Sequence, residues 1–229
     1  MRVDLNCDMG ELGDAAHEAA LMECVASANI ACGAHAGDET TMERTARLAI
    51  QLGVRIGAHP GYPDRANFGR LEMPMAPAEI EATVLEQIVR LEAIVTRLGG
   101  AIVHVKAHGA LYNVAVRNRE VAEAIGRAVA KWNPLVRLFG LAGSPMLDVW
   151  RGMGLLVAAE AFADRRYEPD GSLRNRKLPG ALITDPEAAA RQAVELGRAG
   201  ADTICVHGDT PGAVGILKAC RAALADAEL

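Results

Sequence analysis

Short apolar runs alternate with amphipathic stretches along the whole chain. The runs typical of strands are Val3–Cys7, Ala28–Cys32, Val54–Ala58, Ile102–Ala107, Val136–Leu141, Leu155–Ala161 and Thr203–Val206. Between Glu79 and Leu98 the apolar residues fall on one helical face, and Gly99 and Gly100 follow as a stop signal. The pattern predicts about seven β/α units within one domain, residues 1–229.

Capping residues mark several expected helix starts. An oxygen-bearing side chain precedes a proline at Asp185-Pro186, Thr210-Pro211 and Ser144-Pro145. Thr40 with Glu43 fits a capping box. One irregular stretch, Gly61–Pro77, is rich in Pro, Asp and Arg, and a loop of that length inside a compact domain is usually functional.

Alternating strands and helices allow either a closed parallel barrel or an open sheet. The polar residues that share a strand face are Asp4, Asn6 and Asp8 in the first run and His104, Lys106 and His108 in the fourth. An open sheet covered by helices should be apolar on both faces, whereas a barrel can gather polar groups at its carboxyl-terminal mouth. We therefore expect an irregular TIM-like (β/α) barrel with about seven parallel strands.

Almost every expected strand runs into polar or ionisable side chains. In strand order these are Asn6, Asp8 and Glu11; His35 and Asp38; His59 and Asp64; Lys106, His108, Tyr112 and Asn113; Glu160, Asp164 and Arg165; and His207 and Asp209. One such residue alone is more often a cap, but many at one mouth would be costly to desolvate without a function. The pattern predicts an active site there, with His17 at the surface and Cys7 and Cys32 in the core.

Composition narrows the function classes. Only 3% of residues are aromatic and the formal net charge is −5, which disfavours nucleic acid as a partner. No run of about 18 apolar residues occurs and the start, Met1 to Asp4, is polar, so we expect no membrane association and a cytoplasmic location. The five cysteines form no CxxC pair and are expected to be reduced thiols.

Two common cofactor signatures are missing from the sequence. It has no GxxxxGK[ST] phosphate loop, and no GxGxxG follows the first strand. Metal binding stays open, because His and Asp at the mouth suit zinc but no HExxH occurs. His104 and His108 lie on one strand, too far apart to hold one ion easily.

Long motifs give the chain a family resemblance. They are Asp4-Leu-Asn-Cys-Asp-Met-Gly-Glu11, Asn29-Ile-Ala-Cys-Gly-Ala-His-Ala-Gly-Asp38, Gly57-Ala-His-Pro-Gly-Tyr-Pro-Asp64, His104-Val-Lys-Ala-His-Gly-Ala-Leu-Tyr-Asn113, Glu160-Ala-Phe-Ala-Asp-Arg165 and Val206-His-Gly-Asp-Thr-Pro211. In this order they resemble the LamB/YcsF family. The family usually has proline where Ala107 stands and arginine where Leu71 stands; we expect the first change to be mild and the second to weaken an anion contact.

The resemblance implies a fold, an activity and partners. Members are similar to the barrels of glycoside hydrolases and polysaccharide deacetylases. They serve as the A component of bacterial 5-oxoprolinase, which opens 5-oxo-L-proline to L-glutamate with ATP, expected with Mg²⁺, and needs partner subunits B and C. Whether ATP sits on this chain or at a boundary between components stays open, as does the oligomeric state.

The implied chemistry suggests roles for the mouth residues. The expected catalytic set is Asp8, His35, His59, Lys106, His108 and Asp209. The expected substrate-binding set is Asn6, Glu11, Asp38, Arg70, Tyr112, Asn113, Asp164, Arg165 and His207. Within these sets, Asp8 or Asp209 is the general base and His35 or His59 the proton donor. Lys106 and Arg165 hold carboxylate or phosphoryl oxygens.

The sequence leaves two alternatives open. One is a metal-dependent amidase or deacetylase that acts alone, and chelator sensitivity without ATP dependence would favour it. The other is a non-catalytic subunit that binds a small carboxylated metabolite for a partner enzyme. In that case substitutions at the mouth would change affinity without affecting bond cleavage.

Overall fold

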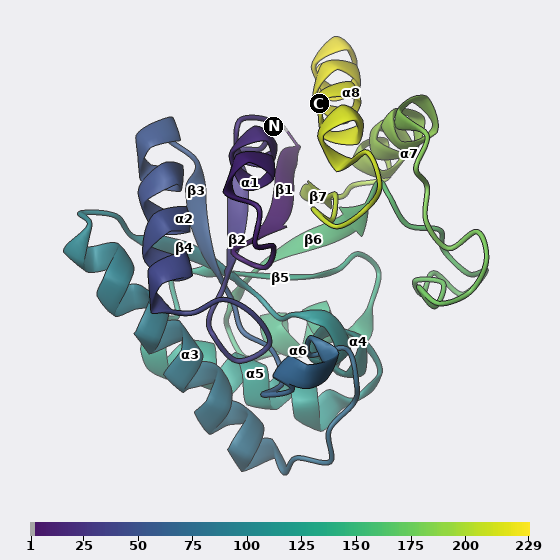
Figure 1. Cartoon of the computed structure of the whole chain (residues 1–229). Helices are drawn as coiled ribbons and strands as arrows, with labels where there is room; N and C mark the ends of the chain where they lie inside the picture. The colour runs from purple at the N-terminus through teal and green to yellow at the C-terminus, as the bar shows by residue number, and fades with distance from the viewer. Residues whose placement is uncertain (1–2) are drawn as a thin grey trace.

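The chain forms a closed barrel of seven parallel strands surrounded by helices (Figure 1). A computed structural model describes residues 3–229, so Met1 and Arg2 of the polar start lie outside the described residues. The strands follow chain order: β1 (Asp4–Met9), β2 (Ser27–Ala31), β3 (Arg55–His59), β4 (Ile102–Lys106), β5 (Arg137–Leu141), β6 (Leu156–Phe162) and β7 (Thr203–Cys205). The expected irregular seven-stranded TIM-like barrel is confirmed, because β1 pairs with both β2 and β7 and closes the sheet.

Helices cover the outside of the barrel (Figure 1). They are α1 (Ala15–Met22), α2 (Glu39–Leu52), α3 (Pro77–Arg97), α4 (Gly109–Arg117), α5 (Arg119–Trp132), α6 (Pro145–Gly152), α7 (Pro186–Arg198) and α8 (Ala213–Asp226). Helix α3 packs on α5, and α7 packs on α8. The apolar face predicted for α3 is buried from Ile80 to Val95. Within residues 3–229, no helix combines the length and apolar character needed to cross a membrane.

Some predicted helix starts are wrong in detail. Asp185 caps α7 as expected, through the backbone N–H of Ala188. Ser144 does precede α6, but its hydroxyl donates to the Leu141 carbonyl instead of capping. Asp38, and not Thr40, caps α2 by accepting from the Thr41 N–H. Helix α8 begins only at Ala213, after Gly212 at φ 77°, so Thr210 is not its cap.

Two irregular segments reach the mouth, one more than the sequence predicts. The stretch Gly61–Pro77 contains a single 3₁₀ turn, η1 (Arg65–Asn67), before α3 begins. Residues 163–185, between β6 and α7, form the second segment, which Figure 1 shows in green running out from the barrel without a helix. Two isolated bridges, Arg165 with Leu182 and Tyr167 with Leu173, fold it back on itself.

The barrel interior is polar below the mouth, as the strand alternation predicts. Asn6 donates to Glu160 Oε1 (3.2 Å) and to Thr203 Oγ1 (2.7 Å), and Asn29 donates to Asn6 Oδ1 (2.8 Å). His104 Nε2 reaches Asn29 Oδ1 at 2.7 Å, and the ring stacks on Phe139. Its imidazole occupies the space of a side chain at Gly57, where an added Cβ would lie 2.0 Å from it. A buried hydrogen-bonded layer therefore forms the floor beneath the site.

Candidate active site

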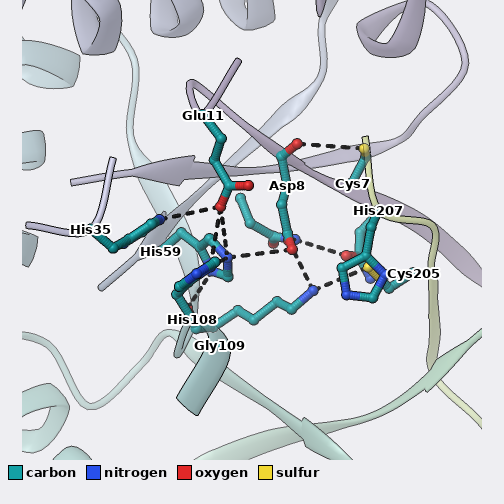
Figure 2. A network of polar contacts seen from close by, with 12 residues as sticks. Cys7, Asp8, Glu11, His35, His59, His108, Gly109, Cys205 and His207 are labelled. Atoms are coloured by element: carbon teal, nitrogen blue, oxygen red, sulfur yellow. Dashed lines mark hydrogen bonds and ion pairs between the residues drawn. The ribbon is translucent and has the colours of Figure 1, made fainter. Parts of the chain in front are cut away.

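The carboxyl ends of the strands bring most of the predicted residues together, as they do in other β/α barrels (Figure 2). Strand β1 and the turn after it supply Asp8 and Glu11. The following strands supply His35, His59, Lys106, His108, Asp164 and His207, all of them predicted. Residues on opposite sides of the mouth belong to two chemically different groups.

Three imidazoles surround the Glu11 carboxylate and form what we call the histidine cluster (Figure 2). Glu11 Oε1 lies 3.2 Å from His35 Nε2, 3.6 Å from His59 Nε2 and 3.1 Å from His108 Nδ1. His59 Nε2 and His108 Nδ1 are 3.0 Å apart. The rings of His35 and His108 stack at 3.7 Å, and all three rings are buried.

Backbone carbonyls fix two of these rings. His59 Nδ1 lies 2.7 Å from the Lys106 carbonyl, and His108 Nε2 lies 2.9 Å from the Phe68 carbonyl. A carbonyl only accepts, so both of these nitrogens carry hydrogen. The opposite nitrogens, which face Glu11, therefore hold lone pairs when the rings are neutral. Burial lowers the pKa of His35 to about 4, so this ring is neutral at pH 7.

The Gly61–Pro77 loop crosses directly over the histidine cluster. Phe68 contacts the rings of His35 and His108 edge-on, at 5.8 and 5.5 Å between ring centroids. The adjacent Gly69 has φ 61°, and a Cβ there would lie 2.8 Å from His35 Cβ and 3.0 Å from the His108 ring. Glycine at this position lets the backbone approach and cover the rings.

Lys106 is the centre of the second group. Its Nζ lies 2.9 Å from Asp8 Oδ1, 2.9 Å from Glu160 Oε1 and 3.1 Å from Cys205 Sγ. Burial alone would lower the Lys106 pKa, but Asp8, Cys205 and Glu160 hold it well above its usual value. Burial would likewise raise the pKa of Asp8, but the charges of His59 and Lys106 hold it well below normal. Both members of the Lys106–Asp8 pair therefore stay charged.

Asp164 and His207 form a further buried pair beside Lys106. Asp164 accepts from the His207 backbone N–H (3.1 Å) and faces its Nδ1 at 3.0 Å. Thr210 Oγ1 donates to the same carboxylate at 2.5 Å, which explains why it does not cap α8. The His207 ring stacks on the Phe162 ring, and Lys106 Nζ lies 5.3 Å from the centre of the Phe162 ring.

At the rim, two arginines hold Asp209. Arg176 donates to both carboxylate oxygens (2.6 and 2.9 Å) and Arg70 donates to one (2.6 Å). Burial would raise the pKa of Asp209, but Arg176 and then Arg70 lower it below normal. Leu71, next to Arg70, is exposed. Arg70 belongs to the Gly61–Pro77 loop and Arg176 to the 163–185 segment, so Asp209 joins these two segments.

Three predicted site residues are engaged elsewhere, whereas Arg165 and Tyr112 are buried with a polar atom left without a partner. Asp38 caps α2, Asn6 lies in the barrel floor, and Asn113 donates to the Gly109 carbonyl within α4. Arg165 is mostly buried and donates to the Arg174 carbonyl at 2.7 Å. Tyr112 is buried near the Lys106 group, where burial and then Glu160 raise its pKa well above normal.

Several residues of the mouth are absent from the predicted site. Glu160 is predicted at a strand end but not in the site, and Cys205 is predicted only as a scattered thiol. The sequence holds a signal for both: Glu160 is the only charged residue of β6, and Cys205 shares the period-of-two face with His207. Arg176 lies in an irregular segment and has no such signal. His17, expected at the surface, is half-buried with its Nε2 3.0 Å from the Gly208 carbonyl.

The cysteine predictions fit the described structure. All five thiols are free and buried. Cys7 and Cys32 face the helices within the hydrophobic core, and burial raises the pKa of Cys32 to about 12. Ala107 is also buried in that core.

Comparison with solved structures shows which barrels are similar. A lactam utilization protein from Thermus thermophilus matches with a TM-score of 0.91 and 41% identity, over 100% of this chain and 98% of that one. A family 4 carbohydrate esterase from Streptomyces lividans matches with a TM-score of 0.51 at 11% identity, covering 98% of this chain and 88% of that chain. The second match shows a shared fold alone.

Curated sequences match along nearly their whole length. The A component of 5-oxoprolinase from Chloroflexus aggregans is 51% identical, over 96% of this chain and 94% of that protein. A protein of the same name from Heliobacterium modesticaldum is 47% identical, over 98% of this chain and 94% of that protein. The LamB/YcsF family profile matches residues 3–229. The chain therefore belongs to the LamB/YcsF family.

Proposed function

We propose that this chain is one component of a multi-subunit 5-oxoprolinase, which hydrolyses 5-oxo-L-proline to L-glutamate while ATP, with Mg²⁺, becomes ADP and phosphate. The observation that carries the proposal is the relationship along the full chain to proteins named as the A component of 5-oxoprolinase. The name of the Thermus protein, a lactam utilization protein, supports the same substrate class. Subunits B and C are the proposed partners, in the cytoplasm.

The reaction explains why ATP is needed. A lactam carbonyl is a poor electrophile, and transfer of the γ-phosphoryl group to its oxygen gives an activated imidate. Water then attacks the former carbonyl carbon, and the ring C–N bond breaks as the nitrogen gains a proton, which leaves an acyl phosphate. A second water hydrolyses this acyl phosphate to the side-chain carboxylate of L-glutamate and phosphate. A protein that catalyses these steps must remove a proton from water and stabilise developing negative charge.

Asp8 is the best candidate for the general base. Asp209, the alternative, accepts three guanidinium hydrogen bonds at the rim. Asp8 lies deeper, bonded to Lys106 through Oδ1, with Oδ2 3.4 Å from His59 Nε2. The charges beside Asp8 hold its pKa below normal, so the carboxylate is ionised and free to accept a proton from water, which can then pass to the leaving nitrogen.

This assignment changes the expected proton donors. His35 is neutral at pH 7, and the His59 nitrogen that faces the mouth holds a lone pair in the neutral ring. Lys106 stabilises negative charge from the opposite side of Asp8. Arg165 is available for the substrate carboxylate, because among residues 3–229 no carboxylate pairs with its buried guanidinium and its Nε lacks a partner.

Reconstitution tests the proposal directly. Glutamate release from 5-oxo-L-proline and ATP is measured with subunits B and C, with and without this chain, and with this chain alone. We expect glutamate only when all three are present. No glutamate in any mixture, with all three proteins shown to be folded, would discard the substrate.

Matched variants then test the base. Asp8→Asn should lower turnover at least roughly 100-fold, while Asp209→Asn should keep most of it. Equal losses, or near-normal activity of Asp8→Asn, would remove Asp8 from the mechanism. If mouth variants change only the affinity for 5-oxo-L-proline and never its cleavage, the chain is a metabolite-binding subunit.

A metal-dependent amidase that acts alone is the second candidate, because the histidine cluster offers donors suited to a divalent ion. It predicts lactam or amide hydrolysis by this chain without ATP, and loss of that activity with a chelator.

A further inference from the structure

We propose that the histidine cluster is a binding site for one divalent transition-metal ion, zinc by its donor set, with Glu11 Oε1, His35 Nε2, His59 Nε2 and His108 Nδ1 as ligands. These four atoms lie within 4.8 Å of one another. The inference does not depend on the proposed function, because metal binding is measured on the isolated chain.

The first argument is the direction of the lone pairs. Carbonyl oxygens of Lys106 and Phe68 hold the hydrogens of His59 Nδ1 and His108 Nε2. When both rings are neutral, His59 Nε2 and His108 Nδ1 face each other at 3.0 Å as two acceptors, with the Glu11 carboxylate as a third beside them. Such an arrangement is repulsive unless a positive charge lies among the three atoms.

The second argument is spacing. Bonds of about 2.0–2.1 Å to a tetrahedral zinc place the ligand atoms about 3.4 Å apart. The separations around Glu11 Oε1 are 3.1, 3.2 and 3.6 Å, and the two facing nitrogens are 3.0 Å apart. A proton can bridge one pair of these atoms, whereas a metal ion can bind all four at once.

The third argument is the support behind the ligands. Imidazoles that bind a metal usually donate their other N–H to a carbonyl or carboxylate, and two of the three rings do so here. The third, His35, has no partner at Nδ1 and stacks on His108 with 1° between the ring planes, so one of these two rings must turn for both to bind the same ion. Gly69 brings the loop backbone over the rings and limits solvent access. An ion held here would place a Lewis acid beside Asp8.

A second set of possible donors, Asp8, Cys205 and His207, also converges at the mouth. The Lys106 ammonium already lies there, 2.9 Å from Asp8 Oδ1 and 3.1 Å from Cys205 Sγ. A resident cation of this kind competes with a metal ion for the same carboxylate. The structure therefore favours the histidine cluster over the thiol-containing set.

Cobalt binding to the full chain tests the site. The purified protein is stripped with a chelator, then titrated with Co²⁺ while the visible spectrum is recorded, and Zn²⁺ is used to displace it. We expect one ion per chain and ligand-field bands without the thiolate charge-transfer band that Cys205 would add. The absence of saturable binding, or a thiolate band, would overturn the proposal.

Variants locate the ion. Glu11→Gln and His59→Ala should each weaken Zn²⁺ binding at least roughly 100-fold, since loss of a residue behind the ligands alone costs about 10 to 100-fold. His17→Gln removes a histidine outside the cluster and should bind as the wild type does. Circular dichroism checks folding, and unchanged affinity in folded Glu11→Gln and His59→Ala would contradict the site even if the wild type binds metal.

Discussion

The two sides of the barrel mouth handle charge in opposite ways. On the Lys106 side, every buried carboxylate contacts a cation or a donor: Asp8 and Glu160 share the Lys106 ammonium, and Asp164 contacts His207 and accepts from Thr210. In the histidine cluster, three rings converge on the single carboxylate of Glu11. The first arrangement already supplies each carboxylate with a cation or a donor, with Glu160 Oε2 alone among these carboxylate oxygens left without a partner, whereas the second gathers acceptors around one point. Removing a member of the first should cost stability, and adding a cation to the second should increase it.

The largest effect is expected from Lys106→Met. The variant leaves Asp8 and Glu160 buried without their shared cation, and breaking a buried ion pair typically costs about 3–5 kcal/mol. We expect a loss of that size in the free energy of unfolding, measured by urea denaturation, together with loss of turnover. Adding Glu160→Gln should recover part of the stability. A loss below about 1 kcal/mol would show that the Lys106 side does not depend on its cation.

The histidine cluster should respond to metal ions. If one Zn²⁺ binds only the folded chain, a free concentration about 100 times the dissociation constant should stabilise the fold by about 2.7 kcal/mol. The midpoint of thermal unfolding, measured with Zn²⁺ and with chelator, should differ for the wild type and hardly at all for Glu11→Gln. Equal shifts in both proteins would mean that Zn²⁺ acts elsewhere on the chain.

Much of the fold follows from hydrophobic periodicity. All seven strands lie within two residues of their predicted ends, because alternation with amphipathic helices is a repeated signal. The period of two also places Asp8 and Lys106 inside the barrel. Individual helix caps are less predictable. Asp38 and Thr40 are both suitable capping residues two positions apart, and only the backbone geometry selects Asp38.

The site is harder to predict than the fold because its residues compete for partners across the barrel. The sequence places His35, His59 and His108 at one mouth, but it does not show that their lone pairs meet at Glu11. Arg176 reaches Asp209 from an irregular segment, where no periodicity fixes side-chain direction. Pro211 predicts that Thr210 caps a helix. In the structure the Thr210 hydroxyl instead donates to Asp164, which is distant in sequence.

A smaller effect should come from the barrel floor. Burial lowers the pKa of His104 to about 3, against about 6.5 in the unfolded chain. The unfolded state therefore binds more protons between these values, so this contribution to stability is lost as pH falls below about 6.5. For one such group the slope is about 1.4 kcal/mol per pH unit. Urea denaturation between about pH 6 and 5 measures how the free energy of unfolding changes with pH. This change should be smaller for His104→Gln than for the wild type, by about 1.4 kcal/mol per pH unit. Equal slopes would mean that His104 takes up its proton in the folded state.

The smallest effects belong to the rim, where solvent screens the Asp209 pairs. Arg176 binds both oxygens and its side chain is 22% exposed, whereas Arg70 binds one oxygen and is 41% exposed. Arg176→Ala and Arg70→Ala should each lower the free energy of unfolding by less than about 1 kcal/mol, with the larger loss for Arg176→Ala. Denaturation at low and high salt should show both losses shrinking as salt rises. A larger or salt-independent loss for Arg70→Ala would show that Phe68, beneath its guanidinium at 4.8 Å, matters more to this residue than Asp209 does. In that case the loop over the histidine cluster, and not the charge pair at the rim, would be what Arg70 stabilises.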